Sequence, residues 1–216
     1  MYADLIAPRS FDDCLKMVER ARYLGYGMLG ILGDFKIESD IVKTYKVALI
    51  NRIDPKSRQK LRMESKLILA KPSSLEDARK LTFSSLVDGV IATYDSERPR
   101  IDYVSLKQLK RNEGALVIPL SYLIRKMCER AQVIRSVYLE LKMAMRIGVY
   151  PILCSFASEE RELVPPRLMI SFSEFFFDLR REESKRFVKD FPMYMLSEER
   201  KLKLKGRGEF EVQSTD

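Results

Sequence analysis

Residues 114–120 read GALVIPL and residues 148–154 read GVYPILC, and these two apolar runs are the clearest indication of the fold class. Each run begins with a glycine and contains no charged residue, which predicts a strand that is buried on both faces. The chain between them is predicted to form one long helix over residues 122–147 that ends at Gly148. A strand, a helix and a second strand of this kind form a crossover between parallel strands.

The same alternation continues in both directions from this unit. Ser10 and Gly25 predict the two ends of a helix over residues 10–24, and Ser73-x-x-Glu76 predicts a capping box that opens a helix through Leu81. Further helices are predicted over residues 37–45, 101–111 and 184–196, the last of them broken near Pro192, with a helical turn at Pro165-Pro166. The strands are predicted over residues 3–7, 26–32, 47–50, 66–70, 87–92, 115–120 and 149–154, with an eighth over 174–179.

Seven or eight strands that alternate with helices predict an α/β fold of mostly parallel strands in a single domain. At about 25 residues per repeat, the chain fits a closed (β/α) barrel of the triosephosphate-isomerase type, a TIM-barrel-like fold. An open doubly wound sheet is the alternative. We expect the barrel domain to span residues 1–200 and residues 201–216 to form a polar, flexible tail.

The composition favours a polyanionic partner and excludes several kinds of enzyme. Lys and Arg number 39 against 31 Asp and Glu, so a net charge of +8 draws the chain to nucleic acid or to an anionic membrane. The absence of histidine excludes triads and dyads that need imidazole. Cys14, Cys128 and Cys154 fit neither a disulfide framework nor a zinc site. Because no stretch reads as a signal peptide or a membrane span, we expect a cytoplasmic protein.

In a barrel of this type, functional residues stand on the loops that follow the strands. Nearly every such loop brings a cation, and several bring hydroxyl groups, so we predict an anion-binding face at that end of the barrel. The alternative is that these loops are simply solvated, because acidic residues such as Asp34, Asp95 and Glu159 stand there too. The loop residues are Arg9, Lys36, Arg52, Lys71, Arg98, Arg100, Ser121, Arg125, Ser155, Ser158, Arg161 and Arg167.

Two further stretches offer cations to a phosphate backbone. Residues 52–66 hold six Lys or Arg against two acidic residues, although a solvated connection between strands is the alternative. On the long helix, Arg135, Lys142 and Arg146 lie beside an apolar stripe, where they either contact phosphates or cover the flank of the barrel with their aliphatic chains. The predicted stripe is Ile124, Met127, Ala131, Ile134, Tyr138, Leu141 and Met145.

Three tyrosines and three aspartates are further candidates for a functional role. Tyr94, Tyr103 and Tyr122 lie near the predicted rim and are candidates for stacking on unpaired bases. The chain has no phosphate-binding glycine loop. Asp4, Asp34 and Asp54 carry oxygen ligands that suit a hard cation, but their spacing matches no metal-binding motif. We therefore predict no catalytic residue, no metal and no cofactor on this chain.

Short motifs follow one another in a defined order between about residues 85 and 172. They are VDGVI (87–91), IDY (101–103), IPLS (118–121), Arg125, ERA (129–131), SFAS (155–158) and Pro166-Arg167. As an ordered set they resemble the archaeal ribonuclease P protein component 3 family. Two positions depart from that pattern: Tyr103 stands where relatives often have histidine, and EFFF (174–177) replaces a glycine-rich eighth strand.

The resemblance implies a barrel subunit of the ribonucleoprotein that removes the 5′ leader from precursor tRNA. In that assembly the RNA subunit holds the active site, and the protein stabilises the folded RNA beside its partner, protein component 2. The other protein components and precursor tRNA are indirect partners. The resemblance also implies RNA contacts by basic residues near the matching positions, which here are Arg125, Arg130, Arg135, Lys142 and Arg167.

The leading hypothesis is a non-catalytic RNA-binding subunit of ribonuclease P. One alternative is a phosphoesterase-like barrel enzyme that holds a phosphorylated small molecule with the same rim, because the fold alone does not choose a function. Another is a protein-interaction module that docks through apolar helix faces. The predicted RNA-binding residues are Arg9, Arg52, Lys71, Arg100, Ser121, Arg125, Arg130, Arg135, Lys142, Ser155, Ser158, Arg161 and Arg167.

Overall fold

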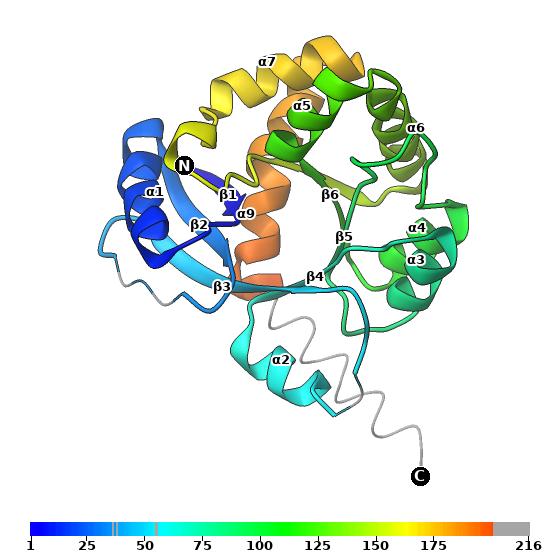
Figure 1. Ribbon diagram of the computed structural model, residues 1–216, viewed down its shortest axis with the longest axis horizontal. Coiled ribbons are helices and arrows are strands. Elements are labelled where there is room, and N and C mark those ends of the chain that lie inside the picture. The colour runs from blue at the N-terminus through cyan, green and yellow to red at the C-terminus, as the bar shows by residue number, and fades with distance from the viewer. Residues whose placement is uncertain (36, 38, 55, 201–216) are drawn as a thin grey trace.

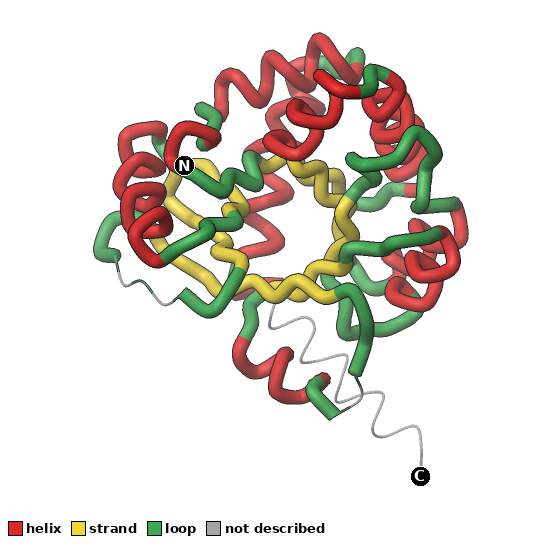
Figure 2. The backbone as a smooth tube through the Cα atoms, in the orientation of Figure 1, coloured by secondary structure: helices red, strands yellow, loops and turns green. Residues whose placement is uncertain are grey.

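Seven strands form one parallel sheet in the order of the chain in the computed structural model, which describes residues 1–35, 37, 39–54 and 56–200. The sheet curves into a ring with helices around the outside (Figure 1, Figure 2). The predicted barrel is confirmed, since an open doubly wound sheet would reverse its strand order. The strands are β1 (Tyr2–Ile6), β2 (Tyr26–Leu32), β3 (Lys43–Ile50), β4 (Leu67–Ala70), β5 (Gly89–Ile91), β6 (Ala115–Pro119) and β7 (Tyr150–Cys154).

The helices begin and end largely at the residues that local chemistry favours. The hydroxyl of Ser10 caps the first helix by accepting a hydrogen bond from the amide of Asp13, and Gly25 ends that helix with a φ of 87°. Gly148 ends another helix in the same left-handed conformation, which glycine adopts without steric cost. The helices are α1 (Phe11–Leu24), α2 (Arg58–Glu64), α3 (Leu75–Thr82), α4 (Tyr103–Arg111), α5 (Leu120–Glu129), α6 (Gln132–Ile147), η1 (Glu160–Glu162), α7 (Pro166–Phe177), α8 (Arg181–Lys185), η2 (Arg186–Asp190) and α9 (Phe191–Leu196).

Apart from β3, in which only Val47 is buried, the strands are largely buried on both faces, so the core has an inner and an outer layer. Leu5, Val47 and Val117 point into the ring and belong to the inner layer of the core. Leu29 and Ile31 point outward and pack in the layer between the strands and the helices. Burial on two faces explains why the strands read as apolar runs and not as an alternating pattern.

The ring closes between β7 and β1 through a few bonds and a helix instead of a strand ladder. The amide of Phe156 donates to the carbonyl of Leu5 at 2.9 Å, and the amide of Ala7 donates to the carbonyl of Ala157 at 2.7 Å. The C-terminal η2 and α9 pack against both β1 and β7. Figure 1 shows α9 in orange within the ring, and its residues Met195 and Leu196 belong to the inner core.

The predicted eighth strand over residues 174–179 is wrong, because residues 166–177 form the helix α7. Three consecutive phenylalanines favour a strand by intrinsic propensity. In the folded chain, however, Met169, Ile170, Ser173 and Phe177 are buried together at helical spacing. Packing of this face against the barrel overrides the propensity, and α9 takes the position at the seam that an eighth strand would fill.

The predicted helix over residues 37–45 is also wrong where the structure describes that segment. Residues 40–42 form bends, and β3 begins at Lys43. The Ser39 hydroxyl accepts hydrogen bonds from the amides of Ile41 and Val42 at 3.4 and 3.3 Å. Such local side-chain bonds compete with helix formation. Lys36 and the predicted tail over residues 201–216 lie outside the described residues.

The predicted long helix over residues 122–147 is two helices, α5 and α6. They are separated at Arg130, whose φ of −148° and ψ of 99° are extended. The predicted apolar stripe does not hold across the break: Ile124 of α5 and Ala131 at the break are both exposed. The buried residues of α6 are instead Val133, Ser136, Val137, Glu140, Leu141 and Ala144.

Two further helix boundaries differ in detail from the prediction. Ser74, and not Ser73, caps α3 by accepting a hydrogen bond from the amide of Asp77 at 3.1 Å. The predicted helix over residues 184–196 exists as a continuous succession of α8, the π-helical turn η2 and α9. Pro192 lies in the first turn of α9, where a proline is tolerated because its missing amide is not needed.

Asp4 of β1 is a buried carboxylate that bridges the seam. Its Oδ1 accepts hydrogen bonds from the amides of Ser155 and Leu5, both at 2.8 Å, and the Ser155 hydroxyl donates to its Oδ2. Burial raises the pKa of Asp4 to about 7 even though these hydrogen bonds lower it. The carboxyl group therefore connects β1 to the chain after β7, where no ladder does so.

Because the folded protein holds the Asp4 proton more tightly than the unfolded chain, acid should stabilise the fold through this residue. The stabilisation is fully present below the usual pKa of 3.8 and is lost as the pH rises through about 7. In urea unfolding between pH 4 and pH 7, we expect the wild-type protein to lose up to roughly 4 kcal/mol relative to Asp4→Asn. A difference between the two proteins that stays constant over this range would contradict the prediction.

Candidate nucleic-acid interface at the barrel rim

The parallel strands place most of the predicted loop residues at one end of the barrel, which we call the rim. Arg9 follows β1, Arg52 follows β3 and Lys71 follows β4. Because the carboxyl ends of all seven strands meet at the same edge, residues far apart in the sequence come together there. The rim residues are Arg9, Arg52, Lys71, Arg98, Arg100, Ser121, Arg125, Ser155, Ser158 and Arg161.

The other predicted cations lie on the helices that lead away from the rim. Arg130 stands at the break between α5 and α6, and Arg167 lies in the first turn of α7. Arg135 is in the first turn of α6, and Lys142 lies two turns further along the same helix. The Nζ of Lys142 is 5.2 Å from the ring centre of Tyr138, so its side chain lies along the helix surface.

Five rim residues, Lys71, Tyr94, Tyr122, Arg125 and Phe156, form a continuous row that we call the rim cluster. The Nζ of Lys71 lies 5.3 Å from the ring centre of Tyr94. The rings of Tyr94 and Tyr122 are 4.9 Å apart, and Tyr122 meets Phe156 edge to face at 5.3 Å. The guanidinium of Arg125 lies 5.0 Å from the ring centre of Tyr122. Two cations are therefore held over one packed aromatic row.

The protonation states of the rim cluster suit an anionic ligand. A hydrogen bond to Tyr94 raises the pKa of Lys71, so this amine is charged at neutral pH. Burial raises the pKa of Tyr122, so its phenol remains neutral. Cation–π contacts contribute about 0.5–2 kcal/mol each and restrict the two cations before any ligand arrives. Restriction of this kind lowers the entropic cost of binding.

Phe156 anchors the rim cluster in a strained backbone conformation. Its side chain is completely buried and its φ is 50°, in the left-handed region that favours glycine. A strained residue of this type costs about 1–3 kcal/mol and persists only when its surroundings hold it. Here the bond from its amide to Leu5 and the bond from the Ser121 hydroxyl to its carbonyl, at 2.8 Å, hold it.

Tyr103, the third predicted tyrosine, is not part of the rim cluster. It begins α4 directly after the cap residue Asp102 and is exposed. Its ring centre lies 5.9 Å from the Nζ of Lys107, one turn along the same helix. Tyr103 is therefore a surface residue at the start of α4 and does not contact the aromatic rings at the rim.

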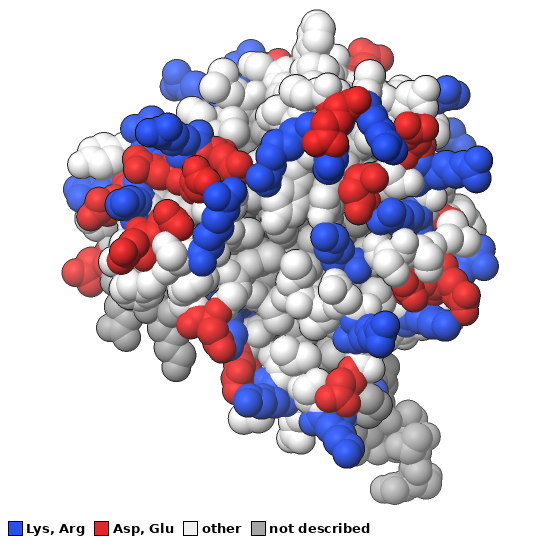
Figure 3. All heavy atoms as spheres, in the orientation of Figure 1, with Lys and Arg blue, Asp and Glu red and all other residues white. Residues whose placement is uncertain are grey.

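The predicted cations divide into those that pair with acids and those that do not. Within the described residues, no ion pair involves Arg52, Lys71 or Arg161 on the rim, nor Arg135, Lys142 or Arg167 on the helices. Exposed pairs contribute at most about 1 kcal/mol, so a phosphate can compete for their cations. Figure 3 shows the resulting mixture of positive and negative side chains around a largely uncharged centre. The pairs are Arg9–Glu159 (2.5 Å), Arg100–Asp95 (2.8 Å), Arg125–Glu162 (3.5 Å) and Arg130–Glu97 (3.9 Å).

The three predicted serines all use their hydroxyl groups inside the protein. Ser121 bonds the carbonyl of Phe156, and Ser155 is completely buried against Asp4. Ser158 donates to Glu162 Oε2 at 2.7 Å, and this contact is one reason why the pKa of Glu162 is lowered. These residues therefore shape the rim loops, while the cations are the groups that face outward.

Glu140 of α6 is a rim-organising residue that sequence reasoning missed. Its buried carboxylate accepts hydrogen bonds from the Thr93 hydroxyl at 2.6 Å and from the amides of Thr93, Arg100 and Ile101 at 2.8, 3.0 and 3.2 Å. These donors span the loop after β5 that carries Tyr94. Burial raises the pKa of Glu140. The sequence contained one indication of this role, a charged residue among the buried positions of α6. The prediction of one unbroken helix assigned the wrong residues to the buried face, so Glu140 was not recognised.

The acidic and cysteine side chains are dispersed over the fold. Among the residues that the structure describes, no three acidic or cysteine side chains gather as metal ligands. Asp4 lies in the seam, Asp34 pairs with Lys46, and Asp54 accepts a hydrogen bond from the amide of Lys56 at 3.1 Å. These three aspartates thus serve separate parts of the fold. None of the described helices is long and apolar enough to cross a membrane.

Comparison with solved structures agrees with the fold. The chain matches one in the cryo-EM structure of archaeal ribonuclease P with mature tRNA, with a TM-score of 0.72 and 16% identity, over 92% of this chain and 90% of that one. It also matches the crystal structure of an uncharacterised protein, with a TM-score of 0.58 and 9% identity, over 90% of this chain and 74% of that one. No family model and no curated protein matches the sequence. At such identities the likeness shows a shared barrel fold.

Proposed function

We propose that this chain is an RNA-binding protein subunit of ribonuclease P, of the protein component 3 type. The observation that carries the proposal is the rim cluster, in which Lys71 and Arg125 are held over packed tyrosine rings at the open end of the barrel. The likeness to a chain of an archaeal ribonuclease P structure, together with the ordered motifs between residues 85 and 172, supports the choice of this ribonucleoprotein.

On this proposal the chain has no catalytic residue, and the RNA subunit cleaves the 5′ leader from precursor tRNA. The protein stabilises the folded RNA by neutralising phosphates that approach one another. Its partners are the ribonuclease P RNA and protein component 2, with the other protein components and precursor tRNA as indirect partners. The assembly works in the cytoplasm and needs no cofactor on this chain.

The contacts are expected to differ in strength. Lys71, Arg52 and Arg161 have no competing acid within 4 Å among the described residues, so their charge is directly available to phosphate. Arg9 and Arg100 must first exchange a carboxylate for a phosphate. Since Lys/Arg–phosphate contacts release counterions, affinity should fall steeply as salt rises.

The test is to titrate transcribed ribonuclease P RNA with the wild-type chain and with Lys71→Ala/Arg125→Ala over a range of salt concentrations. Loss of two phosphate contacts should reduce the slope of log K against log salt by about two. At moderate salt the double variant should bind about 10-fold to 100-fold more weakly. Fluorescence anisotropy or filter binding gives both quantities.

A matched control removes two exposed cations from α1, as Lys16→Ala/Arg20→Ala, with the same change in net charge. This control should keep the wild-type slope and affinity. If both double variants lose binding equally, the rim cluster is not the RNA site. Hydrolysis of a small phosphate ester by the purified chain alone would instead support the phosphoesterase-like alternative.

A further inference from the structure

The helix α6 turns cations and no acid towards the solvent. At 100° per residue, Arg135, Lys142 and Arg146 lie within about 40° of one another, on the side opposite the buried Val137. They therefore do not lie beside the buried face, as the pattern of one unbroken helix had predicted. Glu140, the only acid within α6, is buried and points into the fold. The outer face of this helix is thus positive along its length.

The neighbouring helix α4 continues this positive surface. α4 and α6 pack against each other, and Figure 1 shows both on the outside of the ring. Lys107 of α4 is exposed, and the Nζ of Lys110 donates a hydrogen bond at 2.6 Å to the carbonyl of Ile147, the last residue of α6. No acid occurs within α4. We call the following five residues the basic flank: Lys107, Lys110, Arg135, Lys142 and Arg146.

The acids that border the basic flank are bound to other cations. Asp102 caps α4 and pairs with Arg79 of α3 at 2.6 Å. Glu183 of α8 accepts a hydrogen bond from Arg180 at 3.4 Å, which lowers the pKa of Glu183, and nearby Lys142 contributes to this shift. Within the described residues, no ion pair involves a member of the basic flank. The flank therefore carries a net positive charge that the protein does not neutralise.

The cations of α6 are spaced along a line, as a phosphate backbone requires. At a rise of 1.5 Å per residue, Arg135 and Arg146 are about 16 Å apart along the helix, and a duplex presents several phosphates over this length. Lys142 lies between them. Lys and Arg side chains that meet phosphates position a nucleic acid without reading its sequence. The geometry therefore suits the backbone of a double-stranded segment.

The basic flank and the rim cluster face in different directions. The rim cluster lies where the strands end, so it faces along the axis of the barrel. α4 and α6 lie around the ring, so their outer faces point away from that axis (Figure 2). A short duplex is stiff, and one straight duplex cannot lie on two surfaces that are roughly perpendicular. RNA that occupies both surfaces must come from two separate segments.

We propose that the basic flank binds the phosphate backbone of a second RNA segment, so that the chain bridges one segment at the rim and another on the flank. The inference rests on the proposed RNA-binding function and extends it to a second surface. Bridging would explain how a protein without a catalytic residue stabilises folded RNA, because it holds two segments at a fixed separation.

The test counts the RNA duplexes that one chain binds, with a duplex of about 12 base pairs that is too short to reach round the molecule. Native mass spectrometry should show one wild-type chain with two duplexes. Lys142→Ala/Arg146→Ala should leave one duplex, bound at the rim, and Lys71→Ala/Arg125→Ala should leave one, bound on the flank. The variant with all four changes should bind neither duplex at concentrations where the wild type binds both.

The matched control is again Lys16→Ala/Arg20→Ala on α1, which has the same change in net charge and should still bind two duplexes. Alanine favours a helix, so circular dichroism of Lys142→Ala/Arg146→Ala should show an unchanged fold. In salt titrations, the slope of log K against log salt for the second duplex should fall by about two in this variant.

Two results would overturn the inference and leave RNA binding at the rim intact: a wild-type chain that saturates with one duplex, or a Lys142→Ala/Arg146→Ala chain that still binds two. A wild-type chain that binds no duplex would overturn both this inference and the proposed function. Saturation with one duplex, together with binding to phosphatidylserine vesicles that Lys142→Ala/Arg146→Ala abolishes, would assign the basic flank to a membrane surface instead.

Discussion

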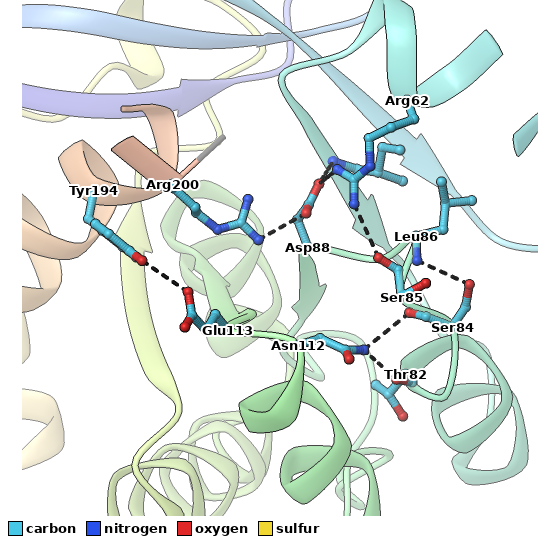
Figure 4. A network of polar contacts seen from close by, with 11 residues as sticks. Arg62, Thr82, Ser84, Ser85, Leu86, Asp88, Asn112, Glu113, Tyr194 and Arg200 are labelled. Carbon is cyan, nitrogen blue, oxygen red and sulfur yellow. Dashed lines mark hydrogen bonds and ion pairs between the residues drawn. The ribbon is translucent and has the colours of Figure 1, made fainter. Parts of the chain in front are cut away.

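Removal of the Asp88 carboxylate is expected to lower the free energy of unfolding by about 3–5 kcal/mol. Asp88 is 1% exposed and lies directly before β5. Its Oδ1 accepts a hydrogen bond from Arg200, which is 2% exposed, at 2.9 Å. Its Oδ2 accepts bonds from Arg62 and from the amide of Ile68, both at 2.8 Å (Figure 4). One carboxylate therefore connects Arg62 of α2, Ile68 of β4 and Arg200, which follows α9.

The measurement is urea or thermal unfolding of Asp88→Ala and Arg200→Met, singly and together. Asp88→Ala leaves the Arg200 guanidinium buried without its counter-charge, so Arg200→Met should stabilise the Asp88→Ala protein. In the wild-type background the same Arg200→Met change should destabilise, because it breaks the buried pair. This reversal of sign is the decisive result, and equal effects of Arg200→Met in both backgrounds would contradict it.

The exposed pair Lys80–Glu76 on α3 provides the control. Its atoms are 2.7 Å apart, which is closer than the Arg200–Asp88 contact, but both side chains are mostly in solvent. Glu76→Ala should leave the free energy of unfolding almost unchanged, because solvent screens an exposed pair. A similar loss for Asp88→Ala and Glu76→Ala would mean that burial does not decide the strength of these pairs.

The Glu140→Ala variant is expected to lose about 3–5 kcal/mol and to release the loop that carries Tyr94. The Thr93 hydroxyl and the amides of Thr93 and Ile101 lose their acceptor, and each buried donor without a partner costs about 1–3 kcal/mol. The amide of Arg100 keeps its second acceptor, the Thr93 hydroxyl. Hydrogen exchange should become faster at the amides of these three residues first. RNA binding should weaken in parallel, since the rim cluster depends on the position of Tyr94.

Two comparisons make the Glu140 result specific. Leu139→Ala, at an exposed neighbour on the same helix, should change neither stability nor exchange by a measurable amount. Glu140→Gln keeps one carbonyl acceptor but places an amide group against a donor. Its loss of stability should therefore fall between those of Leu139→Ala and Glu140→Ala. Unchanged exchange at residues 93, 100 and 101 in Glu140→Ala would show that the carboxylate does not hold the loop.

The rim was predictable in part because it follows from strand order. Once parallel strands are recognised, the residues after each strand must meet at one end, and this reasoning placed Lys71, Tyr94, Tyr122 and Arg125 correctly on the rim. It did not predict that Tyr94 and Tyr122 would touch, nor that Ser155 would be buried against Asp4. Those contacts depend on side-chain direction across the barrel, which a local pattern does not contain.

The sequence alone indicated an α/β barrel of seven or eight mostly parallel strands and most of its helices, because apolar runs and capping residues act over a few positions and leave a local signature. Three features became visible only in the folded chain: the way the ring closes, the helix over residues 174–177, and the burial of Glu140 and Asp88 as partners of distant residues. These features arise from contacts between segments far apart in the chain. Their free energy exceeds the local propensities of the residues involved, so only the folded molecule reveals them.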